Sequence, residues 1–192
     1  MNSIGIMGGT FDPIHNGHLI TATYIKETLN FDKILFIPCY ISPLKTNIIS
    51  SDSKHRLEML KIAIRDIPYF DISDIELNSP DISYTYTTLL KLREFNTSLN
   101  LIIGYDNYAI FDKWYNPEGI FNLAKIFVLK RNLKSKDIII NHSYKEKFVF
   151  LDNPFIEISS TEIRNRIKLR QSIKYFVPEE VENYILKNNL YR

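Results

Sequence analysis

Residues 3–19 read SIGIMGGTFDPIHNGHL, and this stretch decides the fold. It begins with a short apolar run, Ser3–Met7, of the kind that forms a buried strand. Gly8 and Gly9 follow, and a helical pattern begins at Asn16. Glycines let the backbone approach a bulky anion closely, and the free N–H groups of a first helical turn favour bound phosphate. The stretch therefore predicts a strand–loop–helix unit with an anion site in its loop.

The remainder of the chain repeats this alternation. Further strands are expected at Lys33–Ile37, at Phe70 and Ile72, at Leu99–Ile103, at Lys125–Leu129, and at either Phe148–Leu151 or Phe155–Ile158. Helices are expected over Asn16–Leu29, Ser53–Ile64, Thr85–Phe95, Ser159–Leu169 and Pro178–Leu186, and one begins at Asn116-Pro117-Glu118. Alternating strands and helices predict an α/β domain with a mostly parallel sheet, whose ligands bind beyond the carboxyl ends of the strands.

Length and composition narrow the class of protein. The 192 residues, 45% of them hydrophobic, suit one domain over residues 1–192, with a C-terminal helical segment from about residue 159 packed on it. A net charge of +2 argues against a nucleic-acid partner. The longest stretch without charged residues, Pro13–Ile25, is too short for a membrane span, and no signal peptide precedes it, so we expect a cytoplasmic protein. One cysteine, Cys39, excludes an intrachain disulfide.

His15 and His18 are three residues apart, hence on one face of the first helical turn, with Gly17 keeping the space between them clear. Imidazolium donors beside a helix N-terminus suit nucleotidyl transfer, in which negative charge grows on the departing phosphates. The helix dipole lowers a histidine pKa, and a bound triphosphate would restore the proton. Two other interpretations stay open: capping or core histidines, and a zinc pair, for which no third ligand of suitable spacing follows.

A second anion site is expected near the C-terminus, where residues 158–164 read ISSTEIR. Ser159 and Glu162 have the spacing of a capping box, so Ser159 starts a helix. The hydroxyls of Ser159, Ser160 and Thr161 can donate to phosphate oxygens, and Arg164 can add a bidentate contact. The alternative is an ordinary surface helix with solvated basic residues. With the anion site of the first loop, this gives two anion sites at opposite ends of the chain, which together fit one long polyphosphate.

Several motifs occur in a fixed order: GGTFDPIHNGHL at 8–19, HRLEML at 55–60, SYT at 83–85, IGYD at 103–106, WY at 114–115, ISSTEIR at 158–164 and PEEV at 178–181. The ordered set resembles the His-x-Gly-His nucleotidyltransferases, and most closely the bacterial nicotinate-mononucleotide adenylyltransferases. The resemblance covers nearly the whole chain. It implies a Rossmann-like, doubly wound sheet with helices on both faces. It also implies that ATP and nicotinate mononucleotide react to give nicotinate adenine dinucleotide and pyrophosphate, without a covalent enzyme intermediate.

The resemblance also implies roles for individual residues. His15, His18 and Arg164 would be catalytic. The ATP site would comprise these three together with Gly8, Gly9, Thr10, Phe11, Gly104, Asp106, Arg131, Ser159, Ser160 and Thr161. The acceptor nucleotide would contact Lys45, Tyr84, Thr85, Trp114 and Tyr115, with Trp114 stacking on the pyridine ring. Mg²⁺ would arrive with ATP, bound mainly by phosphate oxygens, so no metal ligand is expected from the protein.

Departures from the family pattern gather on the acceptor side. Leu44 stands where a histidine is common, Ser79 and Asp81 replace Arg and Gly, and Thr87 replaces Asp. The acceptor could therefore be nicotinamide mononucleotide or another phosphate. A non-catalytic nucleotide sensor and a metal-dependent hydrolase using the two histidines are further alternatives. Plainer interpretations also exist for single residues: Trp114 as core, Asp106 as a helix cap, and His55 as a packing or hydrogen-bonding residue.

Overall fold

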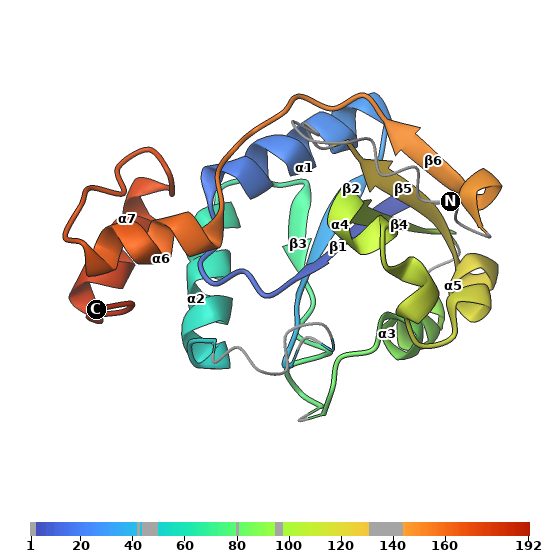
Figure 1. Ribbon diagram of the computed structural model, residues 1–192, viewed down its shortest axis with the longest axis horizontal. Coiled ribbons are helices and arrows are strands. Elements are labelled where there is room, and N and C mark those ends of the chain that lie inside the picture. The colour runs from blue at the N-terminus through green and yellow to red at the C-terminus, as the bar shows by residue number, and fades with distance from the viewer. Residues whose placement is uncertain (1–2, 42, 44–49, 80, 95–97, 131–143) are drawn as a thin grey trace.

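The described residues of the protein are built on one six-stranded sheet. The structure, a computed structural model, describes residues 3–41, 43, 50–79, 81–94, 98–130 and 144–192. The strands are β1 (Ser3–Gly9), β2 (Lys33–Pro38), β3 (Phe70–Ile72), β4 (Ser98–Gly104), β5 (Ala124–Leu129) and β6 (Phe148–Leu151). Their order is β3-β2-β1-β4-β5-β6, and each neighbouring pair is parallel (Figure 1). The order reverses between β1 and β4, where such sheets bind ligands beyond the strand ends.

The helices connect these strands. They are α1 (Asn16–Thr28), α2 (Ser53–Ile64), α3 (Thr85–Arg93), α4 (Tyr105–Tyr108), α5 (Pro117–Leu123), α6 (Ser160–Lys168) and α7 (Glu179–Lys187), with 3₁₀ turns η1 (Phe111–Lys113) and η2 (Lys145–Lys147). Most of the expected elements are confirmed to within a residue or two. Of the two candidates for the sixth strand, Phe148–Leu151 is the correct one. The short α4 was not foreseen, because four residues show no helical periodicity. Within the described residues, no helix has the length and apolar character that crossing a membrane requires.

Successive side chains of the central strands point to opposite faces of the sheet and belong to two different hydrophobic cores. In β5, Ile126 and Val128 point to the core beneath α3 and α5, whereas Phe127 points to the core beneath α1 and α2. Leu101 and Ile102 of β4 divide in the same way. Both faces of the sheet are therefore covered by helices, which explains why the strands are apolar throughout rather than alternating with polar residues.

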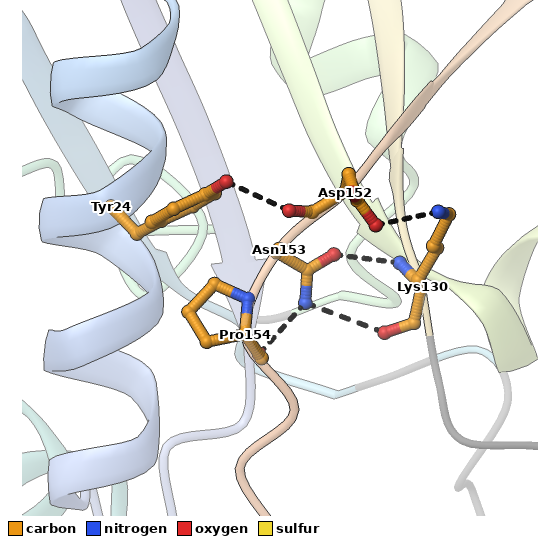
Figure 2. A network of polar contacts seen from close by, with 5 residues as sticks. All are labelled: Tyr24, Lys130, Asp152, Asn153 and Pro154. Atoms are coloured by element: carbon orange, nitrogen blue, oxygen red, sulfur yellow. Dashed lines mark hydrogen bonds and ion pairs between the residues drawn. The ribbon is translucent and has the colours of Figure 1, made fainter.

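The C-terminal helices lie at one end of the sheet, beside α2 and the start of α1 (Figure 1). The chain reaches them from β6 through a coil that passes along α1. Figure 2 shows what holds the start of this coil: the Tyr24 hydroxyl of α1 donates to the Asp152 carbonyl at 2.7 Å, and Lys130 Nζ donates to the Asp152 carboxylate at 2.6 Å. The Asn153 side chain accepts from the Lys130 backbone N–H at 2.8 Å. This network directs the coil toward the start of α6.

Candidate active site

A cavity of about 810 Å³ opens at the carboxyl edge of the sheet, where the order of the strands reverses. Its walls come from the loop after β1, the start of α1, the end of β4 and the start of α6. The residues assigned to ATP that line it are Gly9, Thr10, Phe11, His15, His18, Gly104, Asp106, Ser159, Ser160, Thr161 and Arg164. Segments from opposite ends of the chain therefore share one cavity. Gly8 lies just before it and is exposed, and Arg131 lies outside the described residues.

The two histidines cap α1 reciprocally. His15 is the N-cap residue, and its side-chain Nδ1 accepts from the His18 N–H at 3.3 Å. His18 Nδ1 in turn accepts from the His15 N–H at 3.3 Å. This arrangement has the connectivity of a Ser–Glu capping box but uses imidazoles. The rings stack with centroids 3.6 Å apart, and His15 is 5% exposed. The capping interpretation of these histidines is therefore correct, and it leaves a second role open.

The caps determine which ring nitrogens carry protons. A neutral imidazole has one N–H, and because both Nδ1 atoms accept, the proton of each neutral ring is on Nε2. Burial lowers the pKa of His15 to about 4, so this ring is neutral near pH 7 in the free protein. Nε2 is then the hydrogen-bond donor of each neutral ring, and both residues line the cavity. Donation to a phosphate oxygen therefore does not require an imidazolium beforehand.

Close packing holds the two rings in place. A Cβ at Gly17 would lie 3.0 Å from His15 Nδ1, so a side chain there would push on the ring that caps α1. Phe11 has φ 49°, in the left-handed region that bulky residues rarely adopt. Its ring is buried and meets His18 edge-on at 5.2 Å and Phe36 at 5.7 Å. The strained Phe11 backbone therefore turns its ring into the core behind His18.

The second helix, α6, starts at Ser159, as its sequence predicts. Ser159 is the N-cap residue, and its Oγ accepts from the Glu162 N–H at 3.1 Å. Ser160 Oγ donates to the Pro13 carbonyl at 2.9 Å, which ties α6 to the first loop. The N–H groups of the first turn remain a place where an anion is favoured.

Arg164 joins the two helix starts directly. Its Nη1 donates to the Asp12 carbonyl at 2.7 Å, and its Nη2 donates to Thr161 Oγ1 at 3.3 Å. Asp12 is three residues before His15. The guanidinium is thus anchored on the loop that leads to the histidines, in the cavity that they share.

A buried arginine that sequence reasoning left without a role supports the same region from behind. Arg56 is 1% exposed and donates to the carbonyls of Thr10 at 2.9 Å, Cys39 at 2.8 Å and Ser51 at 3.1 Å. It thereby ties together the ends of β1 and β2 and the chain before α2. The available signal was its spacing, because Arg56, Met59 and Leu60 lie on one buried face of α2. His55, its neighbour, bonds Tyr184 Oη through Nδ1 at 2.9 Å, as the plainer interpretation anticipated.

Of the acceptor-side residues that the structure describes, none lines the cavity. Tyr84, at the N-cap of α3, and Tyr115 lie together with ring centroids 5.1 Å apart, and Thr85 follows as the first residue of the helix. Trp114 is half-buried against Phe111 at 4.9 Å, and its buried Nε1 has no hydrogen-bond partner among the described residues. Lys45 lies outside the described part of the chain. The assignment of these residues to the acceptor stays a prediction.

The fold and the cavity define the class. A parallel sheet in this order, with two helix starts facing one cavity at the reversal of the strands, is a nucleotide-binding architecture. The model of the cytidylyltransferase-like family matches residues 6–166, so the chain is a member of that family of nucleotidyltransferases.

Individual relatives narrow the family assignment further. The chain is 45% identical over 189 residues to a protein of Hydrogenobaculum sp. (strain Y04AAS1) named "Probable nicotinate-nucleotide adenylyltransferase", covering 98% of this chain and 97% of that one. A Clostridium beijerinckii protein of the same name is 40% identical over 204 residues, with 100% of both chains covered. Within the larger family, the chain belongs to the nicotinate-nucleotide adenylyltransferases.

A solved structure shares the fold. Plasmodium falciparum nicotinic acid mononucleotide adenylyltransferase, solved in complex with NaAD, superposes with a TM-score of 0.81. The match covers 100% of this chain and 98% of that one at 22% identity. The fold that the two proteins share therefore includes the C-terminal helices of this chain.

Proposed function

We propose that the protein transfers the adenylyl group of ATP to nicotinate mononucleotide, giving nicotinate adenine dinucleotide and pyrophosphate in NAD biosynthesis. The observation that carries the proposal is the contact of Arg164 with the Asp12 carbonyl at 2.7 Å, which unites the starts of α1 and α6 around one cavity. A single polyphosphate can then meet both helix N-termini. Membership of the nicotinate-nucleotide adenylyltransferases supports the choice of acceptor.

The reaction needs positioning and charge more than proton transfer. A phosphate oxygen of the mononucleotide attacks the α-phosphorus of ATP in line, the bond from that phosphorus to the bridging oxygen of the β-phosphate breaks, and pyrophosphate leaves with the electron pair. A phosphate monoester has a second pKa near 6, so the nucleophile is already a dianion near pH 7 and needs no general base. Direct displacement also requires no covalent enzyme intermediate.

His15, His18 and Arg164 stabilise the charge that grows on the departing phosphates. Each neutral imidazole donates through Nε2, and the anion itself favours uptake of a second proton on Nδ1, at the expense of a capping bond. Arg164 adds a permanent positive charge, and the first-turn N–H groups of α6 add oriented dipoles. Gly9, Thr10 and Phe11 shape the wall beside the phosphates, while Gly104 and Asp106 form the floor near adenosine.

Mg²⁺ is the divalent ion that we propose to accompany ATP. Among the described residues, no three His, Cys, Asp or Glu side chains form a group that could hold a metal. The carboxylate of Asp12, three residues before the N-cap of α1, already accepts from Ser51 and Tyr191. These residues fit an ion held mainly by phosphate oxygens. When bound, such an ion supplies charge neutralisation on the phosphates.

The acceptor side is proposed from the family pattern. Trp114 would stack on the pyridine ring beside Tyr115, the backbone near Tyr84 and Thr85 would receive the nicotinate carboxylate, and Lys45 would contact the phosphate. Arg131, on the ATP side, would contact a phosphate or the ribose. The rings of Tyr84 and Tyr115 lie with their centroids 5.1 Å apart, which supports placing both residues in one acceptor site.

The test is a pyrophosphate-release assay with ATP and Mg²⁺ across a panel of acceptors: nicotinate mononucleotide, nicotinamide mononucleotide and phosphopantetheine. We expect a higher kcat/KM for the acid than for the amide, because a site that hydrogen-bonds a carboxylate discriminates strongly against its analogue. Equal values for the two mononucleotides would refute the preference. Release with none of the acceptors would refute adenylyl transfer and favour a nucleotide sensor.

A further inference from the structure

The end of the chain reaches into the active-site loop. The hydroxyl of Tyr191 donates to Asp12 Oδ1 at 2.6 Å, between residues 179 positions apart in sequence. The same hydroxyl lies 3.3 Å from Ser51 Oγ. The Tyr191 ring is half-buried and packs against the core beneath α1 and α2. The hydroxyl of a residue in the C-terminal segment thus contacts the GGTFDP loop.

The local sequence explains how the chain turns back to make this contact. α7 ends in a Schellman motif: the Leu190 N–H donates to the Ile185 carbonyl at 3.1 Å, and the Asn189 N–H donates to the Leu186 carbonyl at 3.3 Å. Asn189 has φ 52°, a conformation that asparagine tolerates better than most residues. Tyr191 itself has φ 64°, which is unfavourable for a bulky residue and persists because its side chain is held.

Asp12 is the residue on which these contacts converge. Its carboxylate accepts from Tyr191 Oη, from Ser51 Oγ and, at 3.2 Å, from the Ser51 N–H. Its carbonyl accepts from Arg164. Asp12 is 5% exposed, so water cannot easily replace a donor that is lost. Burial and the Asp12 carboxylate raise the pKa of Tyr191, which keeps its hydroxyl protonated as a donor.

We propose that Tyr191 is a positioning residue for phosphate transfer: its hydroxyl holds Asp12, and through the Asp12 main chain it sets the place of the Arg164 guanidinium relative to His15 and His18. The part of this inference that concerns catalysis rests on the proposed function. The part that concerns structure, that Tyr191 orders the segment of residues 10–18, does not depend on which substrate is bound. Tyr191 does not touch the phosphates in this scheme.

The test compares Tyr191→Phe with Tyr184→Phe. Tyr184 is a matched control, because it is also a half-buried tyrosine of the C-terminal segment with one hydroxyl contact, to His55 at 2.9 Å, away from the cavity. Both variants keep the ring and lose the hydroxyl: Tyr191→Phe loses the bond to Asp12 and the longer contact with Ser51, and Tyr184→Phe loses the bond to His55. We expect Tyr191→Phe to lower kcat roughly 10-fold with a smaller change in KM for the acceptor, because small displacements of catalytic groups cost rate. Tyr184→Phe should keep kcat even where its Tm falls equally.

Two further measurements separate the possible outcomes. Hydrogen exchange of residues 10–18 without substrate should speed up in Tyr191→Phe and not in Tyr184→Phe. If the effect passes through Asp12, the double variant Asp12→Asn/Tyr191→Phe should lose no more kcat than Asp12→Asn alone. Equal kcat and equal exchange in the two tyrosine variants would overturn the proposal. If the wild-type protein releases no pyrophosphate with any acceptor, the proposed function fails, and exchange together with affinity for a non-hydrolysable ATP analogue decides whether Tyr191 orders the loop.

Discussion

Replacing Arg56 by methionine tests how the ends of β1 and β2 are held together. Methionine has a similar reach but no donor. The substitution removes three hydrogen bonds of 3.1 Å or shorter, to the carbonyls of Thr10, Cys39 and Ser51. These carbonyls belong to segments far apart in sequence, and Arg56 bonds all three of them through one side chain.

The size of the effect follows from burial. Leaving a buried carbonyl without its donor costs about 1–3 kcal/mol. The bond to Cys39 is fully buried and takes the upper part of this range, while the carbonyls of Thr10 and Ser51 are partly accessible and can recruit water. Removing the buried charge returns some free energy, since Arg56 has no carboxylate in ion-pair contact among the described residues. We expect a net loss of about 3 kcal/mol in the free energy of unfolding.

Urea unfolding, followed by the fluorescence of the single tryptophan, Trp114, measures this quantity. Arg65→Met is the matched control: Arg65 caps the end of the same helix, its side chain is 63% exposed, and its ion pair with Asp66 spans 3.6 Å. An exposed pair of this kind contributes about 0–1 kcal/mol. If Arg56→Met loses less than about 1 kcal/mol, or no more than Arg65→Met, the reasoning about the buried guanidinium is refuted. Turnover should fall in Arg56→Met and stay unchanged in Arg65→Met.

Three further predictions concern the cavity and its neighbourhood. Burial lowers the pKa of His15 to about 4, below its ordinary value of 6.5. The unfolded chain therefore takes up this proton first as the pH falls, and the free energy of unfolding should drop between pH 6.5 and pH 4 by up to about 3 kcal/mol relative to His15→Gln; parallel pH profiles for the two proteins would contradict this. His18→Ala should keep most of its affinity for ATP in calorimetry while kcat falls steeply, whereas equal losses would indicate a role in ground-state binding. Trp114→Ala should weaken binding of nicotinate mononucleotide and spare ATP, and a fall in ATP affinity instead would show that the acceptor pocket is misassigned.

The fold was largely predictable because its strands are strong local signals. Runs such as Lys33–Ile37 and Lys125–Leu129 are apolar on both faces, as buried parallel strands require. The run Phe155–Ile158 looks equally strand-like but lies in the coil between β6 and α6, with Phe155 43% exposed. Its alternate residues Ile156 and Ile158 line the cavity instead of pairing with a neighbouring strand. Local pattern cannot tell these two environments apart.

The site residues, too, were predictable only where their chemistry is visible in the local sequence. Glycines, histidines and hydroxyls at two helix starts carry their chemistry in local sequence, and the structure brings them to one cavity. The contacts of Arg56 and Tyr191 were not predicted, because their partners are distant in sequence: Arg56 bonds Thr10, and Tyr191 bonds Asp12. The reciprocal caps of His15 and His18 were foreseen only as a plain alternative. Spacing could place Arg56 on the buried face of α2, but it could not show which distant carbonyls the guanidinium bonds.

The contact between Tyr191 and Asp12 also bears on the order in which the molecule is made. The loop that contains Asp12 is translated long before the residues that anchor it, Arg164 and Tyr191, which follow Asp12 by 152 and 179 positions. A growing chain can form the β1–α1 unit before the contacts of Arg164 and Tyr191 with Asp12 exist. A chain cut short before Arg164 would therefore carry the GGTFDP motif without the two contacts that hold Asp12.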